Sequence, residues 1–482
     1  MSAPTQDKAL DTPLASGSRP GIIQRLAEQA VRFKRVLIVV AGVGTVLSGL
    51  AGYFNTYQTV KSGMSAPKSP PGVASSGAGL SVVILPFSPL SADPDQAYFA
   101  DGLTAELTAD LSRITGAVVI ASTTALTLKE KPVGLLQVGK ELGVRYVLEG
   151  TVQRSVDKVR INARLGDAVS GAHLWAETFD GESSDLFALQ DQVTARVANS
   201  IGRELVVIAA RESESRKMNP SAVDLMMRGI ALANRPNSLE RLQQQEQAFR
   251  QVLVLDPGNI DAMARLSRAL VLQKLFFGTL LPADIADVKL QEGYRYAGQV
   301  KELDPNNSRA ELSLGLYALV HGDFTEALRA FGAGIALDRN NALFAVSLAN
   351  TYVLMGEHAK ALPYADLAIR LDPRGQGRFG AMYHAGLANF FLGNNDLAID
   401  WFLKSRAGNP NQPRAYAGLV VAYASKGDTP KARESVSQLL QLVPKYSMSQ
   451  SAEHPFPSST SAYKQQYDSV YLPAARAAGL PE

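Results

Sequence analysis

The chain has 482 residues, of which 46% are hydrophobic and 19% charged, a balance typical of a folded protein with two or three domains. The formal net charge of +3 is too small to indicate a nucleic-acid-binding protein. Because the sequence has no cysteine, disulfides, thiolate nucleophiles and cysteine-based zinc sites are excluded.

Residues 36–54 form a run of 19 residues without a charged side chain. A run of this length can span a bilayer. A buried core helix is disfavoured because the polar flanking segments offer it no packing partner. A cleaved signal peptide is disfavoured by the long preceding region and the lack of a small-x-small cleavage site. We therefore predict one N-terminal transmembrane helix.

Positive side chains are more numerous before this run than after it, which predicts a cytoplasmic tail over residues 1–35. Residues 55–79 include a stretch rich in Ser, Pro, Gly and Ala and are expected to form a flexible linker. In a Gram-negative bacterium the following domains would be periplasmic and anchored in the inner membrane. Gly44, Ser48 and Gly52 can seat a second helix and give a homodimer, but the ordinary glycine content of membrane helices explains them as well.

Residues 80–205 alternate between strand and helix patterns and predict an α/β domain with a mixed sheet. Strands are expected at 82–85, 117–121, 145–154, 158–165 and 172–179, and helices at 98–114, 135–142 and from Leu186 to Ile201. In the strand after Lys158, alternate residues from Val159 to Leu165 should face the core. Asp101 and Glu106 share the first helix, and a solvated helix face explains them.

Five motifs in this domain occur in an order that resembles a known family. They are Val83-Ile84-Leu85-Pro86-Phe87, Tyr98-Phe99-Ala100-Asp101-Gly102-Leu103-Thr104, Leu142-Gly143-Val144-Arg145-Tyr146-Val147-Leu148-Glu149-Gly150, Gly171-Ala172-His173-Leu174-Trp175-Ala176-Glu177 and Leu186-Phe187-Ala188-Leu189-Gln190-Asp191. The stretch resembles the TolB-like amino-terminal (FlgO-like) domain. The resemblance implies a place between a membrane span and tetratricopeptide repeats, often after a class III adenylate cyclase domain. Only about 35 residues precede the span here, so we expect no cyclase domain and no enzymatic activity.

Residues 221–444 repeat with a period of 34 residues. Leu-Asp pairs at 255, 303, 337 and 371, followed by Asn409-Pro410 and Val443-Pro444, close successive units at intervals of 48, 34, 34, 37 and 34 residues. Gly322, Gly356, Gly393 and Gly427 keep the same period, each followed five residues later by alanine. A fixed period of this length predicts an all-α solenoid of stacked helix hairpins. The units resemble tetratricopeptide repeats, with four good copies, two degenerate ones and an insertion in the 48-residue interval.

Known tetratricopeptide repeats line their concave side with first-helix positions, and this resemblance implies a groove for a protein or peptide partner. Carried over to this chain, the groove residues are Arg309, Leu312, Leu316, Leu319, Leu343, Val346, Asn350, Val353, Tyr383, Leu387, Phe390, Arg414, Val421 and Ala424. A large exposed apolar strip indicates a partner. Alternatively, these positions form inter-helix core, or the C-terminal tail over 445–482 fills the groove. That tail predicts a tyrosine-rich helix at 462–472, ended or kinked by Pro473.

No catalytic, metal or cofactor constellation emerges. The segment from Gly134 to Lys140 has phosphate-loop spacing, but Glu141 replaces the required Ser or Thr and its leucines fit a helix face. The five histidines are scattered without metal-ligand spacing. We therefore expect a membrane-anchored, non-enzymatic interaction scaffold or sensor. The alternatives are a regulatory component of a cyclic-nucleotide signalling system and an envelope-assembly factor.

Overall fold

The computed structural model describes residues 80–482 except 92, 115, 130–132, 156, 201–219, 236, 376 and 451–459. The chain divides into two compact units, Met1–Lys68 and Ser69–Glu482, and the described residues belong to the second. The predicted tail 1–35, membrane helix 36–54 and linker 55–79 lie outside the described residues. Among the helices that are described, none is long and apolar enough to cross a membrane.

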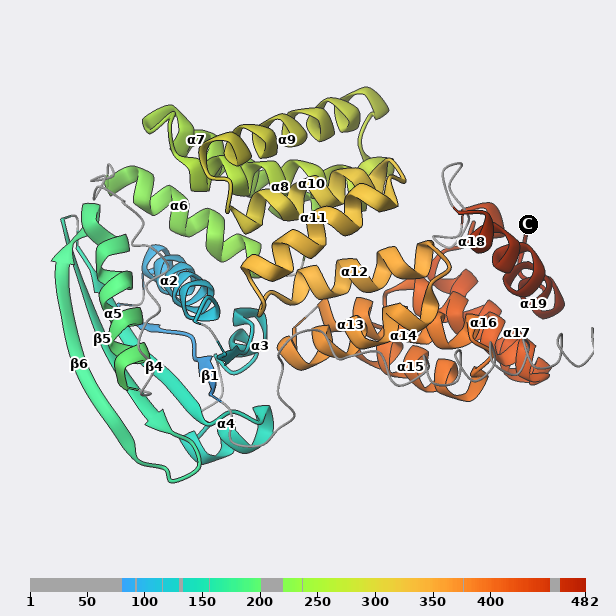
Figure 1. The fold of residues 1–482 in the computed structure, drawn as a ribbon, viewed down its shortest axis with the longest axis horizontal. Helices are drawn as coiled ribbons and strands as arrows, with labels where there is room; N and C mark the ends of the chain where they lie inside the picture. The colour runs from blue at the N-terminus through green and yellow to red at the C-terminus, as the bar shows by residue number, and fades with distance from the viewer. Residues whose placement is uncertain are drawn as a thin grey trace, which may run out of the picture. The chain divides into compact units, whose positions relative to one another are not determined.

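The first part of this unit is built on one mixed sheet (Figure 1). Its strands are β1 (Ser81–Ile84), β2 (Ser88–Pro89), β3 (Val118–Val119), β4 (Tyr146–Arg154), β5 (Lys158–Asp167) and β6 (His173–Glu182). They are ordered β3-β1-β4-β5-β6, with β2 beside β4. β1 runs parallel to β3 and β4, whereas β4, β5 and β6 form an antiparallel meander. The predicted mixed sheet is confirmed, although the strand expected at 117–121 shortens to β3.

Helices cover both faces of the sheet. On one face, α2 (Pro94–Ser112) and α5 (Leu186–Ser200) pack over alternate residues of β5, including Val159, Ile161 and Leu165. On the other face, α3 (Ser122–Leu126) and α4 (Leu135–Leu142) cover the first strands, with Val138 in one cluster with Val83. A short turn, η1 (Ser183–Asp185), precedes α5. The predicted inward face of β5 is therefore confirmed.

Over the described residues between 220 and 442, the second part consists of six helix hairpins in chain order. They are α6 (Pro220–Ala233) with α7 (Leu239–Leu255), α8 (Ile260–Phe277) with α9 (Ala283–Leu303), α10 (Ser308–Val320) with α11 (Phe324–Leu337), α12 (Ala342–Leu354) with α13 (His358–Leu371), α14 (Gly377–Phe391) with α15 (Asn395–Gly408), and α16 (Pro413–Lys426) with α17 (Thr429–Leu442). The predicted insertion is the lengthening of α8 and α9 and the short turn η2 (Gly278–Leu280) between them.

The repeated glycines lie at helix ends and the repeated alanines lie at close helix contacts, as the period predicts. Gly322, Gly356, Gly393 and Gly427 end the first helices with positive φ angles of 70–81°, which glycine adopts without a steric penalty. The alanines that follow five residues later are fully buried between the paired helices. Gly315 lies so close to the second helix that an added Cβ would meet the Phe331 ring at 2.4 Å.

The C-terminal tail forms η3 (Met448–Gln450) and then one helical stretch made of α18 (Ser461–Gln466), a π-helical turn η4 (Tyr467–Tyr471) and α19 (Leu472–Ala478). The helix does not end at Pro473, because the stretch continues to Ala478, but its regular α-helical geometry is interrupted directly before this proline, as the alternative prediction of a kink indicates. The wide π turn lies directly before Pro473, and the N–H of Leu472 bonds to the carbonyl of Tyr467. Proline then occupies the first turn of α19, where a missing N–H is tolerated.

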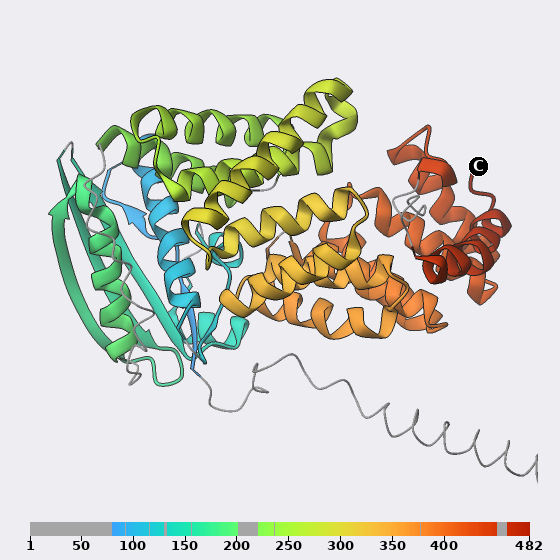
Figure 2. The same cartoon turned by 45° about the horizontal axis from the view of Figure 1, so that its top comes forward.

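The core does not stop at the boundary between the sheet and the repeats. One hydrophobic cluster joins Leu103 and Leu107 of α2 to Met226 and Ile230 of α6. The two helices lie side by side in Figures 1 and 2. An added Cβ at Gly102 would lie 2.9 Å from the carbonyl oxygen of Met227. The α/β part and the first hairpins therefore share one interior.

Candidate functional site

The groove of the solenoid is lined by the first helices of successive hairpins. A cavity of about 210 Å³ lies in it, with walls from α8, α10, α12, α14, α16 and Tyr463 of α18. Most of the predicted groove residues are buried in the chain itself. The buried ones are Leu312, Leu316, Leu319, Val353, Tyr383, Leu387, Phe390 and Val421; Arg309, Val346, Asn350, Arg414 and Ala424 are half-buried, and Leu343 is exposed. The expected exposed apolar strip is therefore wrong for the buried residues.

The C-terminal helix covers this groove, as the alternative expectation had it. Tyr463, Tyr467 and Tyr471 are at most 2% exposed, and their four-residue spacing places them on one face of the helix. Tyr463 belongs to a cluster with Leu316 and Leu319, while Tyr467 and Tyr471 belong to a cluster that contains the buried groove residues of α14 and α16. Figure 1 shows α19 beside α16, in agreement with their contacts.

Polar contacts fix the register of this helix. The Nε2 atom of His358 lies 2.6 Å from Oε1 of Gln466, and burial lowers the pKa of this histidine. The hydroxyl of Thr460 donates to the carbonyl of Met355 at 2.9 Å. These contacts attach the start of the helix to the turn between α12 and α13.

The residues that line the cavity beneath the helix include buried polar atoms without partners. Among the described residues, the Tyr383 hydroxyl and the Nδ1 atom of His384 are buried and have no hydrogen-bond partner. Burial and the neighbouring Arg414 lower the pKa of His384 to about 3, so its ring is neutral near pH 7. Burial also lowers the pKa of Arg414, whose guanidinium lies 5.7 Å from the Tyr383 ring centre. No acidic side chain in the described part of the chain forms an ion pair with Arg414.

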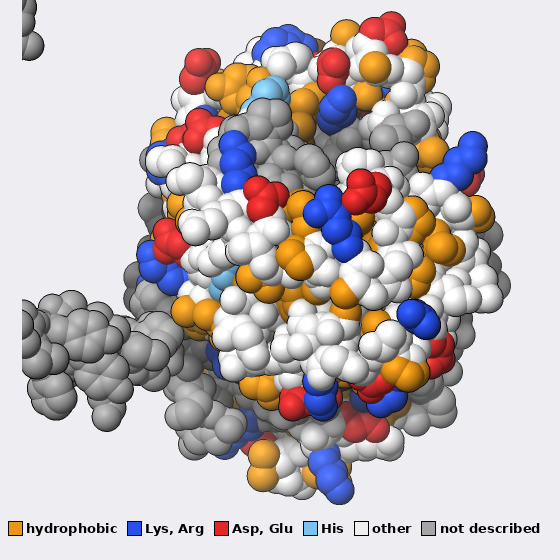
Figure 3. Space-filling view, turned by 90° about the vertical axis from the view of Figure 1, so that its right-hand side faces the viewer, with side chains coloured by type: hydrophobic (Ala, Val, Ile, Leu, Met, Phe, Trp, Pro, Cys, Tyr) orange, Lys and Arg blue, Asp and Glu red, His pale blue; other side chains and the backbone are white. Residues whose placement is uncertain are grey.

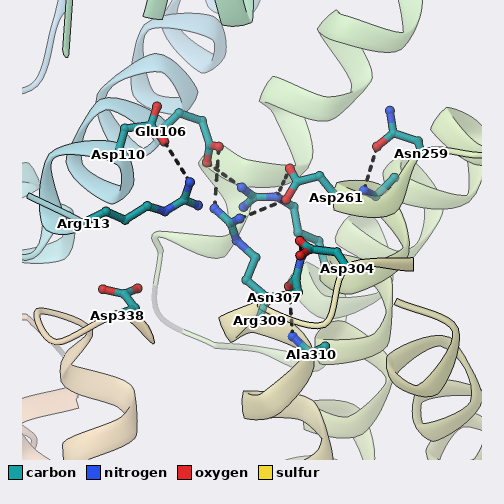
Figure 4. A network of polar contacts seen from close by, with 12 residues as sticks. Glu106, Asp110, Arg113, Asn259, Asp261, Asp304, Asn307, Arg309, Ala310 and Asp338 are labelled. Atoms are coloured by element: carbon teal, nitrogen blue, oxygen red, sulfur yellow. Dashed lines mark hydrogen bonds and ion pairs between the residues drawn. The ribbon is translucent and has the colours of Figure 1, made fainter. Parts of the chain in front are cut away.

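Arg309 lies elsewhere, at the junction between the α/β part and the repeats (Figure 4). Its guanidinium is 3.1 Å from Asp261 and 3.7 Å from Glu106. Glu106 also accepts a 2.6 Å hydrogen bond from Arg265. The interpretation of Asp101 and Glu106 as a solvated face is wrong, because both are buried against cations. Asp101 is paired with Lys129.

The junction network contains more arginine than carboxylate. Burial alone would lower the pKa of Arg265, but Asp261 and Glu106 raise it above its usual value. Burial, with Arg265 and Arg309 nearby, lowers the pKa of Arg268 to about 10. Burial raises the pKa of Asp110 to about 6, against the opposing effect of Arg113. The net charge of this network therefore depends on the carboxylates of Glu106 and Asp261.

Repeat-closing aspartates form local hydrogen bonds that hold the ends of the repeats. In three closures the aspartate accepts from an asparagine three residues later: Asp256 from Asn259, Asp304 from Asn307, and Asp338 from Asn341, at 3.0–3.2 Å. Asn307 also caps α10 by accepting from the N–H of Ala310, as Figure 4 shows.

The fourth closure departs from this pattern because Gly375 replaces the asparagine. Asp372 instead accepts from the hydroxyls of Thr123 and Thr124 at 2.8 and 2.7 Å. Asn340, within the third closure, donates to the carbonyl of Ser112 at 2.8 Å. Sequence reasoning missed these contacts, although the loss of asparagine at 375 is a signal that could have revealed the first of them.

The remaining sequence candidates are structural. Gly134 precedes α4, so the segment with phosphate-loop spacing is a helix, as the leucine pattern indicates. His321 is exposed, and the centre of its ring lies 4.2 Å from the centre of the Tyr317 ring. Within the described ranges, no group of three His, Asp or Glu side chains could hold a metal ion. Figure 3 shows basic and acidic side chains interspersed on the face at the C-terminal end of the solenoid.

A family model described as tetratricopeptide repeat matches residues 312–375 and 383–447, so the last four hairpins are tetratricopeptide repeats. "Putative adenylate cyclase 3" of Rhizobium meliloti (strain 1021) is 42% identical over 188 residues, which cover 39% of this chain and 32% of that protein. A TPR repeat-containing protein of Methanocaldococcus jannaschii is 28% identical over 137 residues, which cover 28% of this chain and 23% of that protein. The chain thus spans less than two thirds of either relative.

Among solved structures, the crystal structure of the APC/C hetero-tetramer Cut9–Hcn1 matches 60% of this chain and 48% of that chain, with 20% identity and a TM-score of 0.36.

Proposed function

We propose that the chain is a non-enzymatic interaction scaffold or sensor whose groove takes a helical segment of a protein partner. The observation that carries the proposal is the chain's own C-terminal helix, which presents Tyr463, Tyr467 and Tyr471 to the first helices of the repeats. Amphipathic helices bind grooves through anchors spaced by three or four residues. The groove is therefore complementary to a helix that carries aromatic residues four positions apart.

A partner must compete with the helix that already occupies the groove. An internal competitor lowers the apparent affinity by the fraction of molecules in which the groove is open. Displacement would release 461–478 as well as the contact between His358 and Gln466. Binding of a partner would therefore change the position of the C-terminal end. This change is the signal by which the scaffold could act as a sensor.

We place this scaffold on a membrane. The uncharged run 36–54 would anchor the chain in a bacterial inner membrane, with the tail 1–35 cytoplasmic and the linker 55–79 leading to periplasmic domains. Gly44, Ser48 and Gly52 would allow a homodimer through this helix. The assignment of residues 80–205 to the TolB-like family is part of the proposal. Its support is the order of the five motifs and the mixed α/β arrangement.

The second candidate is a regulatory component of a cyclic-nucleotide signalling system. The observation that favours it is the 42% identity over 188 residues to the Rhizobium meliloti protein named as an adenylate cyclase. Deleting the gene and measuring cellular cyclic AMP tests this candidate. An unchanged level in the deletion strain, under conditions where the chain is produced, contradicts it.

Competition by the chain's own helix tests the groove proposal. A fluorescent peptide with the sequence of residues 460–482 is titrated onto the full chain and onto the double variant Tyr467→Ser/Tyr471→Ser. The variant weakens the resident helix and should bind the peptide at least roughly tenfold more tightly than the wild type. A peptide carrying the same two serines is the control and should bind neither protein. Equal binding by both proteins, with the variant's helical circular dichroism retained, contradicts the proposal.

A further inference from the structure

The last strand of the sheet has a free edge. In the strand order, β6 pairs with β5 on one side, and no described strand lies on its other side. Figures 1 and 2 both show β6 as the outermost strand of the sheet. α5 packs on one face of β6, where Leu189 lies close to Gly181. A strand edge without a neighbour is a template for pairing with another strand.

Backbone groups of alternate residues point toward this free edge. The N–H of Ser183 donates to the carbonyl of Asp157 at 2.9 Å, which sets the phase of the hydrogen bonds between β5 and β6. In an antiparallel ladder, residue pairs that exchange two hydrogen bonds alternate with pairs that exchange none. The odd-numbered residues of β6 therefore bond to β5, and the even-numbered residues from Ala176 to Asp180 turn their N–H and C=O groups away from it. Among the described residues, these outward groups have no hydrogen-bond partner.

β6 lacks the features by which edge strands usually avoid pairing, which are lysine, proline and bulges. The stretch from Trp175 to Glu182 contains no lysine and no proline. Its pairing with β5 is regular, because the one register shift skips Leu174, before this stretch. The even-numbered side chains of the stretch are exposed. It therefore offers a second strand a regular and accessible edge.

Two of the three acidic side chains of β6 are neutralised within the chain. Glu177 pairs with Arg196 of α5 at 2.5 Å, and Asp180 pairs with Arg160 of β5 at 2.6 Å. A partner strand therefore need not be basic. An identical strand is accepted as long as like charges do not lie directly opposite each other. This condition excludes a two-fold axis at Glu177 or at Asp180.

We propose that β6 pairs with β6 of a second copy of this chain, antiparallel and with Thr178 on the two-fold axis. In this register Thr178 faces Thr178 of the second copy and Ala176 faces its Asp180, so the outward backbone groups of all three residues gain partners. No like charges face each other, and facing threonines form a favourable cross-strand pair. The contact uses neither the repeat groove nor residues 36–54, so it goes beyond the scaffold function and stands whether or not a partner enters the groove.

Site-specific cross-linking of the purified full chain tests this register. Because the sequence has no cysteine, one introduced cysteine reports a single position. In Thr178→Cys the two thiols are on facing residues whose Cα atoms are about 5.5 Å apart, within the range of a disulfide. The matched control is Ala176→Cys, whose two copies are roughly 14 Å apart along the paired strands. Under oxidation, most Thr178→Cys chains should become covalent dimers, whereas Ala176→Cys chains should remain monomers. A dimer yield at position 178 no greater than that at position 176 overturns the pairing.

Backbone hydrogen exchange of the full chain provides a second readout. The amides of residues 176, 178 and 180 should exchange at least roughly tenfold more slowly in the wild type than in Thr178→Lys, which places two lysines opposite each other on the axis. Ala176→Lys is the matched control, because its lysine faces Asp180 of the second copy and should leave the protection in place. The odd-numbered amides, which bond to β5, should stay protected in all three proteins and so report that the sheet is intact. Equal effects of the two lysines overturn the proposal.

Dilution of the wild type separates a second copy from other occupants of the edge. Pairing between copies depends on concentration, so the protection of the even-numbered amides should fall on dilution. Protection that does not change on dilution overturns the second copy and assigns the edge to another segment of the same chain. Fast exchange of these amides in the concentrated wild type also overturns it and leaves the edge to a strand of another protein.

Discussion

Neutralising Glu106 should destabilise the junction between the α/β part and the repeats. Its carboxylate is buried, 2.6 Å from Arg265 and 3.7 Å from Arg309. With Arg268, the cluster contains three arginines against the carboxylates of Glu106 and Asp261. Glu106→Gln raises the local net charge from +1 to +2 by this count.

The size of the expected loss of stability depends on which carboxylate partners the arginines retain. Breaking a buried ion pair by removing one partner typically costs about 3–5 kcal/mol. Asp261 still lies 2.8 Å from Arg265 and 3.1 Å from Arg309, so each arginine retains one carboxylate. We therefore expect the free energy of unfolding to fall by about 3 kcal/mol, the lower end of that range.

Urea unfolding of single and double variants provides the assay. Arg268→Met removes the arginine whose pKa is lowered by burial and by its like-charged neighbours, and in the Glu106→Gln background it should restore about 1–2 kcal/mol. Glu326→Gln is the control, because Glu326 forms an exposed pair with Arg329 and should cost less than about 1 kcal/mol. The ion-pair network would not hold the junction if Glu106→Gln cost no more stability than Glu326→Gln, or if the effects of the Glu106 and Arg268 changes were strictly additive.

Two other substitutions test single features. The pKa of Asp110 is raised to about 6, so its contribution to stability is complete below pH 3.8 and is lost as the pH rises through 6. Asp110→Asn should thus stabilise the chain by about 2 kcal/mol at pH 7.5 and by almost nothing at pH 4 in urea unfolding, and a pH-independent difference would contradict this. Gly315→Ala places a Cβ 2.4 Å from Phe331 and should cost about 1–3 kcal/mol, whereas Gly332→Ala meets nothing within 4 Å and should stabilise by about 0.5 kcal/mol. Equal melting temperatures for these two variants would show that a side chain at position 315 can be accommodated without a loss of stability.

The repeats could be predicted because their signals are local and periodic. A glycine that ends each first helix and an alanine at each close helix contact recur at fixed intervals, so the hairpins follow from spacing alone. The inward face of β5 could be predicted for the same reason, since alternation along a strand fixes which residues share a face. Neither prediction depends on which distant segments of the chain pack against these elements.

The site could not be predicted in this way because its contacts join distant segments. The repeat position of Arg309 indicates a helix face, but α2 supplies Glu106, which lies about 200 residues earlier in the chain. Likewise, the buried state of Leu316 and Phe390 depends on a helix beyond the last repeat. Apolar residues in a groove have the same sequence pattern whether a partner or the chain itself covers them.

In the chain without a bound partner, the C-terminal helix occupies the repeat groove. Backbone hydrogen exchange of residues 461–478, with the free peptide 460–482 as reference, measures this occupancy. We predict that these amides exchange at least roughly a hundredfold more slowly in the full chain than in the peptide. Exchange at the rate of the free peptide, while α14 and α16 remain protected, would show instead that the groove is open.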